Sequence, residues 1–174
     1  MSQSLQTSLL WDGCAARRGE IASVVLAMTG DGLVIEVDAP FHDDPAPGAA
    51  IGPSWKLWEH EVVEVFVAAA TAPVYVEVEL GPHGHHLVLR LEGIRKDVAR
   101  CLPLDFSATI DGMRWRGRAV VPAGWLPPGA PSSWRVNATA IHGRGDARRF
   151  LTAARLMAPA PDFHRPDEFL ASRL

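Results

Sequence analysis

Three glutamates in two apolar stretches are the residues of this sequence best suited to chemistry. Glu64, Glu77 and Glu79 alternate with valine and leucine, and Trp58 shortly precedes them. Carboxylates accept hydrogen bonds from hydroxyl groups, and indole rings offer apolar surfaces on which a sugar ring can stack. The combination therefore predicts a site for a small hydroxylated ligand.

The alternation of residue types decides which face of a sheet these side chains share. Residues 60–68 carry valine at odd positions, whereas residues 74–80 are apolar at even positions. Since core residues lie on one face, the numbers of cross-strand partners must sum to an odd value. A hairpin closed by residues 68–73 sets Glu64 opposite Glu77, and a slip of two residues would instead set Glu64 opposite Tyr75 or Glu79. The residues that share the non-core face in every register are Glu64, Tyr75, Glu77 and Glu79.

The next stretch, residues 86–91, is expected to pair with residues 74–80. If its leucines at odd positions point inward, His86 and Arg90 join the acidic face. Directly opposed like charges destabilise a strand pair by up to ~1 kcal/mol. Solvent, Arg90, His86, a raised carboxyl pKa, a bound cation or a polyol must then offset the repulsion. A hydrated outer face and a ligand platform both remain open at this point.

Short strands bounded by Gly, Pro or Ser must position these residues. The stretches with β character are residues 21–28, 33–37, 60–68, 74–80, 86–91, 104–110, 114–121 and 134–141. Residues 39–53 are rich in proline and form a loop, and residues 146–157 suit either a strand or a helix, of which we favour the strand. This spacing predicts an all-β fold, an antiparallel β-sandwich or barrel, with residues 1–174 as a single domain.

Composition excludes several classes of function. The formal net charge is −3 and no basic run is present, so nucleic acid is not an expected partner. The N-terminal residues do not resemble a signal peptide, and no apolar run reaches the ~18 residues of a membrane helix. We expect a cytoplasmic protein without a membrane partner, in which Cys14 and Cys101 are reduced.

No catalytic or metal-binding motif is present. The sequence lacks HExxH, CxxCH, GxSxG, GxGxxG and P-loop patterns. The histidines of residues 83–86 could ligate a metal, but such a cluster beside a turn more often binds nothing. The paired glutamates are also found in glycoside hydrolases, yet nothing here fixes the separation or the pKa values that hydrolysis needs. An enzyme is therefore the minority hypothesis, in which the glutamate pair would act as a hydrolase.

Four segments resemble a known family. LWEHEVVEVF, YVEVELGPHGHHLVLRLEG, WRVNATAIHG and the closing PDFHRPDEF are similar to DOMON-like domains related to family 9 carbohydrate-binding modules, especially to a small uncharacterised intracellular branch. The resemblance begins near residue 33. It implies a jelly-roll-like β-sandwich of two antiparallel sheets, with a ligand groove near Trp58, Glu64, Glu77, Asn137 and His164. It also implies haem in some branches and structural calcium in others, although no calcium ligands can be matched here.

We expect a non-catalytic module that binds a saccharide or a similar small hydroxylated ligand and needs no cofactor. Two alternatives stay open: a haem- or metal-binding variant using histidines such as His86 or His142, and a protein-interaction domain without a small ligand. In PDFHRPDEF, the two prolines and two phenylalanines favour a structural role over ligand contact. The residues expected at or beside the ligand are Trp58, Glu64, Tyr75, Glu77, Glu79, His86, Arg90, Asn137 and His164.

Overall fold

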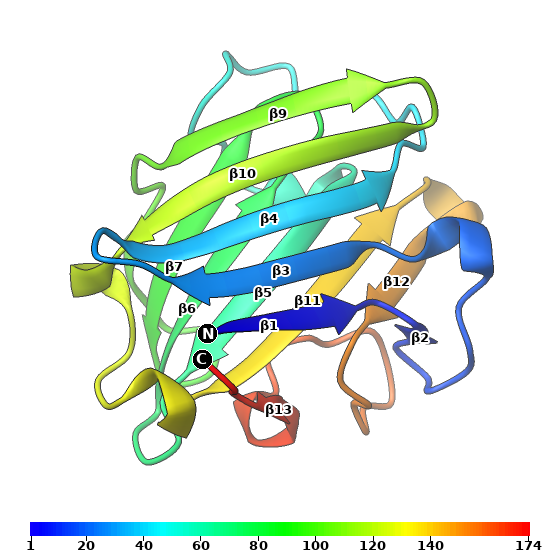
Figure 1. Cartoon of the computed structure of the whole chain (residues 1–174). Helices are drawn as coiled ribbons and strands as arrows, with labels where there is room; N and C mark the ends of the chain where they lie inside the picture. Colours follow the sequence, from blue (N-terminus) through cyan, green and yellow to red (C-terminus); the bar gives the residue numbers. More distant parts are fainter.

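The alternating sequence folds into short antiparallel strands joined by turns, in a computed structural model that describes all 174 residues (Figure 1). The strands are β1 (Ser2–Gln6), β2 (Leu9–Leu10), β3 (Ser23–Met28), β4 (Gly32–Pro40), β5 (Val62–Ala68), β6 (Val74–Leu80), β7 (His86–Glu92), β8 (Asp97–Arg100), β9 (Asp105–Asp111), β10 (Arg114–Pro122), β11 (Arg135–His142), β12 (Arg149–Thr152) and β13 (Leu170–Ala171).

The helices are all short 3₁₀ turns. They are η1 (Arg18–Glu20), η2 (Leu57–Glu59), η3 (Ala123–Trp125), η4 (Pro131–Ser133), η5 (Gly145–Ala147) and η6 (Pro166–Glu168). None has the length or the apolar run needed to cross a membrane. Of residues 146–157, which were predicted as a strand, only Arg149–Thr152 is one; it follows the turn η5.

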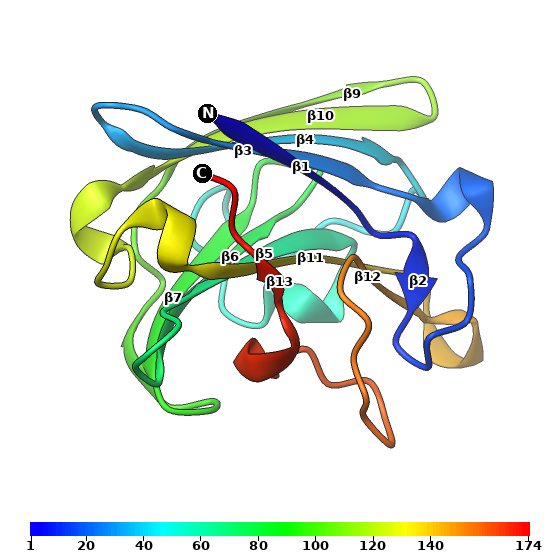
Figure 2. The same ribbon diagram turned by 60° about the horizontal axis from the view of Figure 1, so that its bottom comes forward.

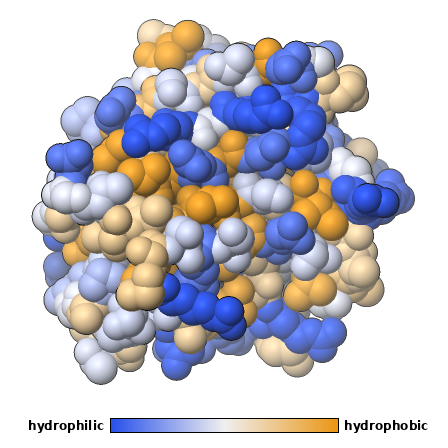
Figure 3. Space-filling view, in the orientation of Figure 1, coloured by the Kyte–Doolittle hydropathy of each residue, from blue (hydrophilic) through white to orange (hydrophobic).

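Two sheets form the layers of a β-sandwich, which confirms the predicted fold class (Figure 2). The smaller sheet has the strand order β1-β3-β4-β10-β9, and the larger has the order β2-β12-β11-β5-β6-β7-β8, with β13 pairing with β11. The chain termini lie together because Gln3 accepts a hydrogen bond from the backbone N–H of Arg173 at 2.8 Å and donates one to the carbonyl of Ala171 at 3.1 Å. The outer face of the smaller sheet mixes hydrophilic and hydrophobic side chains (Figure 3).

A hydrophobic core fills the space between the sheets. The valines at odd positions of β5 and the even-numbered apolar residues of β6 lie in it, as their alternation predicted. Val65 and Val78 are direct cross-strand partners there, and Trp115 reaches in from β10. Burial of these side chains supplies the main driving force for joining the two layers.

A second hydrophobic cluster covers the opposite, outer face of the larger sheet. It joins Phe66 of β5 and Leu89 of β7 to Leu57 from the segment before β5, and to Phe163 and Phe169 from the C-terminal segment. In Figure 2 the covering segments lie on the side of the larger sheet that faces away from the smaller one. The face that carries the glutamates is therefore not a hydrated surface, and that alternative is wrong.

The observed register corrects the expected pairings in two ways. Glu64 lies opposite Glu79, and Phe66 lies opposite Glu77. The numbers of the paired residues sum to an odd value, as predicted, but the pairing is shifted by two residues from the one that set Glu64 opposite Glu77. In β7 the odd positions share the face of the glutamates, with Leu89 opposite Glu77. The expectation that Leu89 points into the sandwich core was wrong because both faces of this strand are buried, so its apolar residues did not identify the core side.

Candidate functional site

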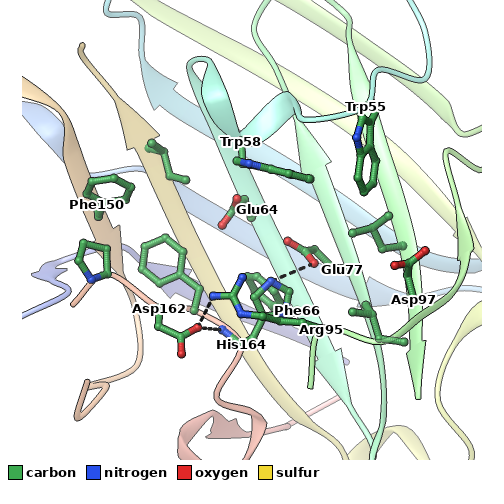
Figure 4. A pocket seen from close by; sticks show the side chains of 15 residues that line it. Trp55, Trp58, Glu64, Phe66, Glu77, Arg95, Asp97, Phe150, Asp162 and His164 are labelled. Atoms are coloured by element: carbon green, nitrogen blue, oxygen red, sulfur yellow. Dashed lines mark hydrogen bonds and ion pairs between the residues drawn. The ribbon is translucent and has the colours of Figure 1, made fainter. Parts of the chain in front are cut away.

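A pocket of about 260 Å³ opens on the outer face of the larger sheet (Figure 4). Its floor consists of side chains from β5, β6, β7 and β11, which are Glu64, Phe66, Glu77, Leu89, Leu91 and Ile141. Its walls come from loops, from the start of β8 and from β12, and contain Trp55, Trp58, Arg95, Asp97, Phe150, Pro161, Asp162, Phe163 and His164. The pocket thus combines aromatic rings with buried and exposed charges.

Three carboxyl groups meet at the floor. Glu64 and Glu77 line the pocket and are 2% and 3% exposed, while Glu79 lies behind them and is 0% exposed. One oxygen of each lies within 4.8 Å of an oxygen of the others. Glu64 accepts a hydrogen bond of 2.5 Å from the Thr139 hydroxyl of β11. In contrast, Glu77 Oε2 and both oxygens of Glu79 have no hydrogen-bond partner.

Burial governs the protonation of this trio. It raises the pKa of Glu64 to about 7, against the opposing effects of the Thr139 hydroxyl, Arg148 and Arg95. Burial, followed by the neighbouring carboxyl groups, raises the pKa of Glu77 and of Glu79 well above the usual range. The backbone of Trp58 lies near Glu79 and favours its charged form, but it does not form a well-aligned hydrogen bond. Without a further partner the trio is therefore partly protonated at neutral pH.

Two tryptophans form the wall above the glutamates. Trp55 and Trp58 meet edge to face, with ring centroids 5.1 Å apart. Trp58 belongs to the turn η2, which is held by its buried neighbour Leu57 and by Arg148, whose guanidinium donates to the carbonyl oxygens of Trp58 and Glu59. The backbone that carries Trp58 is therefore held in place, and Trp55 remains 46% exposed.

The opposite wall is closed by a network around Tyr75. The Tyr75 hydroxyl accepts the backbone N–H of Arg95 at 3.0 Å and lies 2.8 Å from His164 Nδ1. The side chain of Arg95 donates to Asp162 at 2.7 Å, and Asp162 also accepts the backbone N–H of His164. Burial lowers the pKa of His164 to about 4, so the imidazole is neutral at neutral pH, with Nε2 3.7 Å from Glu77 (Figure 4).

The predicted site residues divide into three groups. Trp58, Glu64, Glu77 and His164 line the pocket. Tyr75 and Glu79 are buried directly behind it and contact its lining. His86, Arg90 and Asn137 lie elsewhere.

His86 and Arg90 were placed on the wrong face. His86 pairs with Leu80 and Arg90 with Val76, both of which point into the sandwich core. His86 Nε2 accepts the backbone N–H of Leu104 at 3.1 Å, which is a structural role. The error follows from reading the leucines of β7 as inward-facing.

Asn137 is on the outer face but holds the chain rather than lining the pocket. Its side-chain oxygen accepts the backbone N–H of Ala154 at 2.8 Å, and its nitrogen donates to the Thr152 hydroxyl at 3.1 Å. These bonds anchor the segment that leaves β12 toward the pocket wall. Asn137 is therefore a hydrogen-bonded structural amide.

Several pocket residues were not predicted. Arg95 lies in the turn between β7 and β8 with φ 58°, and no periodic pattern marks such a residue. Phe163 and Asp162 belong to PDFHRPDEF, whose structural interpretation is half correct: the phenylalanines pack, yet the same segment also forms a wall. Phe66 could have been found from its position on the glutamate face of β5.

The histidines proposed as haem or metal ligands lie outside this pocket. His86 is bonded to backbone, and His142 stacks on His42 with ring centroids 3.5 Å apart. Neither lines the pocket. His83 and His85 contact the carbonyl oxygens of Asp44 and Ala49 and so hold the proline-rich loop.

Comparison of the structure with solved structures identifies the same two-sheet fold in proteins of low sequence identity. One is a candidate carbohydrate-binding protein from Bacteroides uniformis, with a TM-score of 0.72 and 16% identity, covering 98% of this chain and 84% of that one. Another is a family 9 carbohydrate-binding module from Caldicellulosiruptor kristjanssonii in complex with cellotriose, with a TM-score of 0.60, 12% identity, and coverage of 91% and 79%.

Comparison of the sequence finds closer relatives. No protein-family model matches the chain. The UPF0462 protein C4orf33 homolog of Mus musculus is 40% identical over 167 residues, which is 91% of this chain and 85% of the mouse protein. The human UPF0462 protein C4orf33 is 36% identical over 163 residues, covering 88% and 79%. At this identity and coverage, the chain belongs to the UPF0462 family.

Proposed function

We propose that this chain is a non-catalytic, DOMON-like binding module whose ligand is a saccharide, held in the pocket between the tryptophans and the glutamates. The observation that carries the proposal is the meeting of Trp58 with Glu64 and Glu77 in one pocket. A sugar presents apolar C–H faces and a rim of hydroxyl groups, and this pocket offers a matching surface for each.

The roles of the residues follow from their positions. Trp58 forms the roof above Glu64 and Glu77 and offers a ring face for stacking (Figure 4). The carboxyl groups below accept hydroxyl protons, and a protonated carboxyl group can also donate one. Arg95 and Asp97 lie at the rim, where they can select among hydroxyl arrangements.

The size of the pocket limits the ligand. A volume of about 260 Å³ lies just below the range of about 300–1,000 Å³ that is usual for drug-sized ligands. We therefore infer that one terminal sugar unit enters and that the rest of a longer chain would pass over Trp55, which is exposed at the mouth. The fold shared with family 9 carbohydrate-binding modules, one of them in complex with cellotriose, supports this ligand class.

Isothermal titration calorimetry with a panel of mono- and oligosaccharides tests the proposal. Trp58→Ala should weaken binding by about 1–3 kcal/mol, because the stacking surface is lost. Trp125→Ala is the matched control, since Trp125 is also half-buried but does not line the pocket. If the wild-type protein binds no saccharide of the panel at millimolar concentration, the proposal is wrong.

A further inference from the structure

The inner end of the pocket contains buried carboxyl oxygens that the protein leaves without hydrogen-bond partners. Glu79 is completely buried and neither of its oxygens has a hydrogen-bond partner. Glu77 Oε2 is buried without a partner as well. Buried polar groups are nearly always hydrogen-bonded, and an unpartnered buried carboxylate is strongly disfavoured. Two such groups side by side indicate a partner that the polypeptide does not supply.

The nearby cations of the chain are engaged elsewhere. Arg95 is paired with Asp162, and Arg148 donates to backbone carbonyl groups of η2. His164 is the nearest basic side chain to Glu77, but its Nε2 lies 3.7 Å away, beyond hydrogen-bonding distance. The Thr139 hydroxyl donates its hydrogen bond to Glu64. No basic side chain reaches Glu79, which is the most deeply buried of the three glutamates.

The arrangement suits a divalent metal ion with oxygen ligands. One oxygen from each glutamate lies within 4.8 Å of the others. An all-carboxylate ligand set without sulfur or imidazole favours calcium, magnesium or manganese over zinc or copper. Calcium accepts six to eight oxygen ligands in flexible geometry, whereas magnesium demands near-ideal octahedral geometry, keeps several waters and usually binds only one or two carboxylates. Three converging buried carboxyl groups therefore favour calcium.

We propose that Glu64, Glu77 and Glu79 form a calcium site at the inner end of the pocket. Glu79 holds the ion from the rear, and Glu64 and Glu77 hold it from the pocket floor. The remaining coordination positions face the pocket, where water or a ligand oxygen completes them. The site does not depend on the saccharide proposal, because its ligands all come from this chain.

Equilibrium dialysis of the EDTA-treated protein against Ca²⁺, without saccharide, tests the site directly. We expect one Ca²⁺ per chain and a thermal midpoint that rises by several degrees with Ca²⁺ and less with Mg²⁺. Glu79→Gln keeps the shape of the side chain and removes its charge, so affinity should fall at least tenfold. Glu59→Gln, an exposed glutamate of η2 paired with Lys56, is the control and should bind like wild type.

Two results would overturn the proposal. One is the absence of bound Ca²⁺ in the wild-type protein at 1 mM free ion, since protons alone would then neutralise the glutamates. The other is unchanged affinity in both Glu79→Gln and Glu77→Gln, which would place any bound ion elsewhere. Circular dichroism checks that each variant is folded. If a variant does not fold, the number of Ca²⁺ ions bound per wild-type chain still shows whether the protein binds calcium. Glu79 does not line the pocket, so its loss separates calcium binding from saccharide contact.

Discussion

The hydroxyl of Tyr75 joins three separate parts of the chain, and its removal is the sharpest test of how the pocket is held. Tyr75 lies on β6, Arg95 in the turn between β7 and β8, and His164 in the C-terminal segment. Burial raises the pKa of Tyr75 to about 12, so the hydroxyl stays protonated under physiological conditions. Tyr75→Phe removes this single oxygen and keeps the buried ring.

The expected loss of stability in Tyr75→Phe follows from the polar groups that lose their hydrogen-bond partner. The backbone N–H of Arg95 loses its acceptor and His164 Nδ1 loses its partner, both at partly buried positions. A typical hydrogen bond contributes about 0.5–1.5 kcal/mol, and an unsatisfied buried group costs about 1–3 kcal/mol. Because water can reach part of this network, we expect the free energy of unfolding to fall by about 1–3 kcal/mol.

Urea unfolding followed by tryptophan fluorescence measures this loss. Ser107→Ala is the control, because Ser107 has an exposed hydroxyl on the opposite sheet, where a substitution should change stability by less than ~0.5 kcal/mol. Saccharide binding should weaken as well, since Arg95 and His164 both line the pocket. A Tyr75→Phe protein as stable as Ser107→Ala would show that the hydroxyl does not hold this wall.

Two further substitutions test other parts of the structure. Asn137→Ala leaves the backbone N–H of Ala154 without an acceptor and should cost about 2–4 kcal/mol in urea unfolding; a cost as small as that of an exposed residue would contradict the anchoring role. Burial lowers the pKa of His142 to about 4, so the unfolded chain takes up a proton below about pH 6.5 that the folded protein does not. The contribution of His142 to stability should therefore decrease as the pH falls from 6.5 toward 4, by at most about 3 kcal/mol. The difference in stability between the wild type and His142→Phe should change with pH by this amount, which thermal unfolding of both proteins across this pH range would reveal.

The sandwich could be predicted because β5 and β6 obey a clear alternation. Their valines identify the inner face, and this fixes which glutamates meet regardless of the exact register. The register itself was wrong by two residues because loop composition does not determine how many residues the turn contains. The inward face of β7 was predicted wrongly for a different reason. Val88 and Leu89 are both buried, each in a different hydrophobic cluster, so hydrophobicity does not distinguish the two faces. Alternation identifies the inner face only where the residues of the two faces differ in polarity.

The candidate site could be predicted only where its residues lie on regular strands or in recognisable segments. Glu64 and Glu77 follow from parity, and Trp58 from its place before the strand. Arg95 and Asp162 come from turns and from an irregular segment, and their meeting across 67 positions of sequence depends on the folded chain. The short-range sequence pattern holds no information on such a contact.

The covering segments explain why an acidic strand face became the floor of a pocket. An antiparallel sheet commonly leaves one polar face in water, and three glutamates would be unremarkable there. Here Leu57 and Phe163 close over that face from two segments far apart in the sequence and remove the solvent. The number of acidic residues is the same in both situations, but only burial leaves the oxygens of Glu79 without partners. Retaining ionisable side chains at such positions costs stability that glutamine would not cost. Their chemistry, as acceptors for hydroxyl groups or as ligands for a cation, is therefore the physical reason to expect glutamate rather than an uncharged residue beneath this cover.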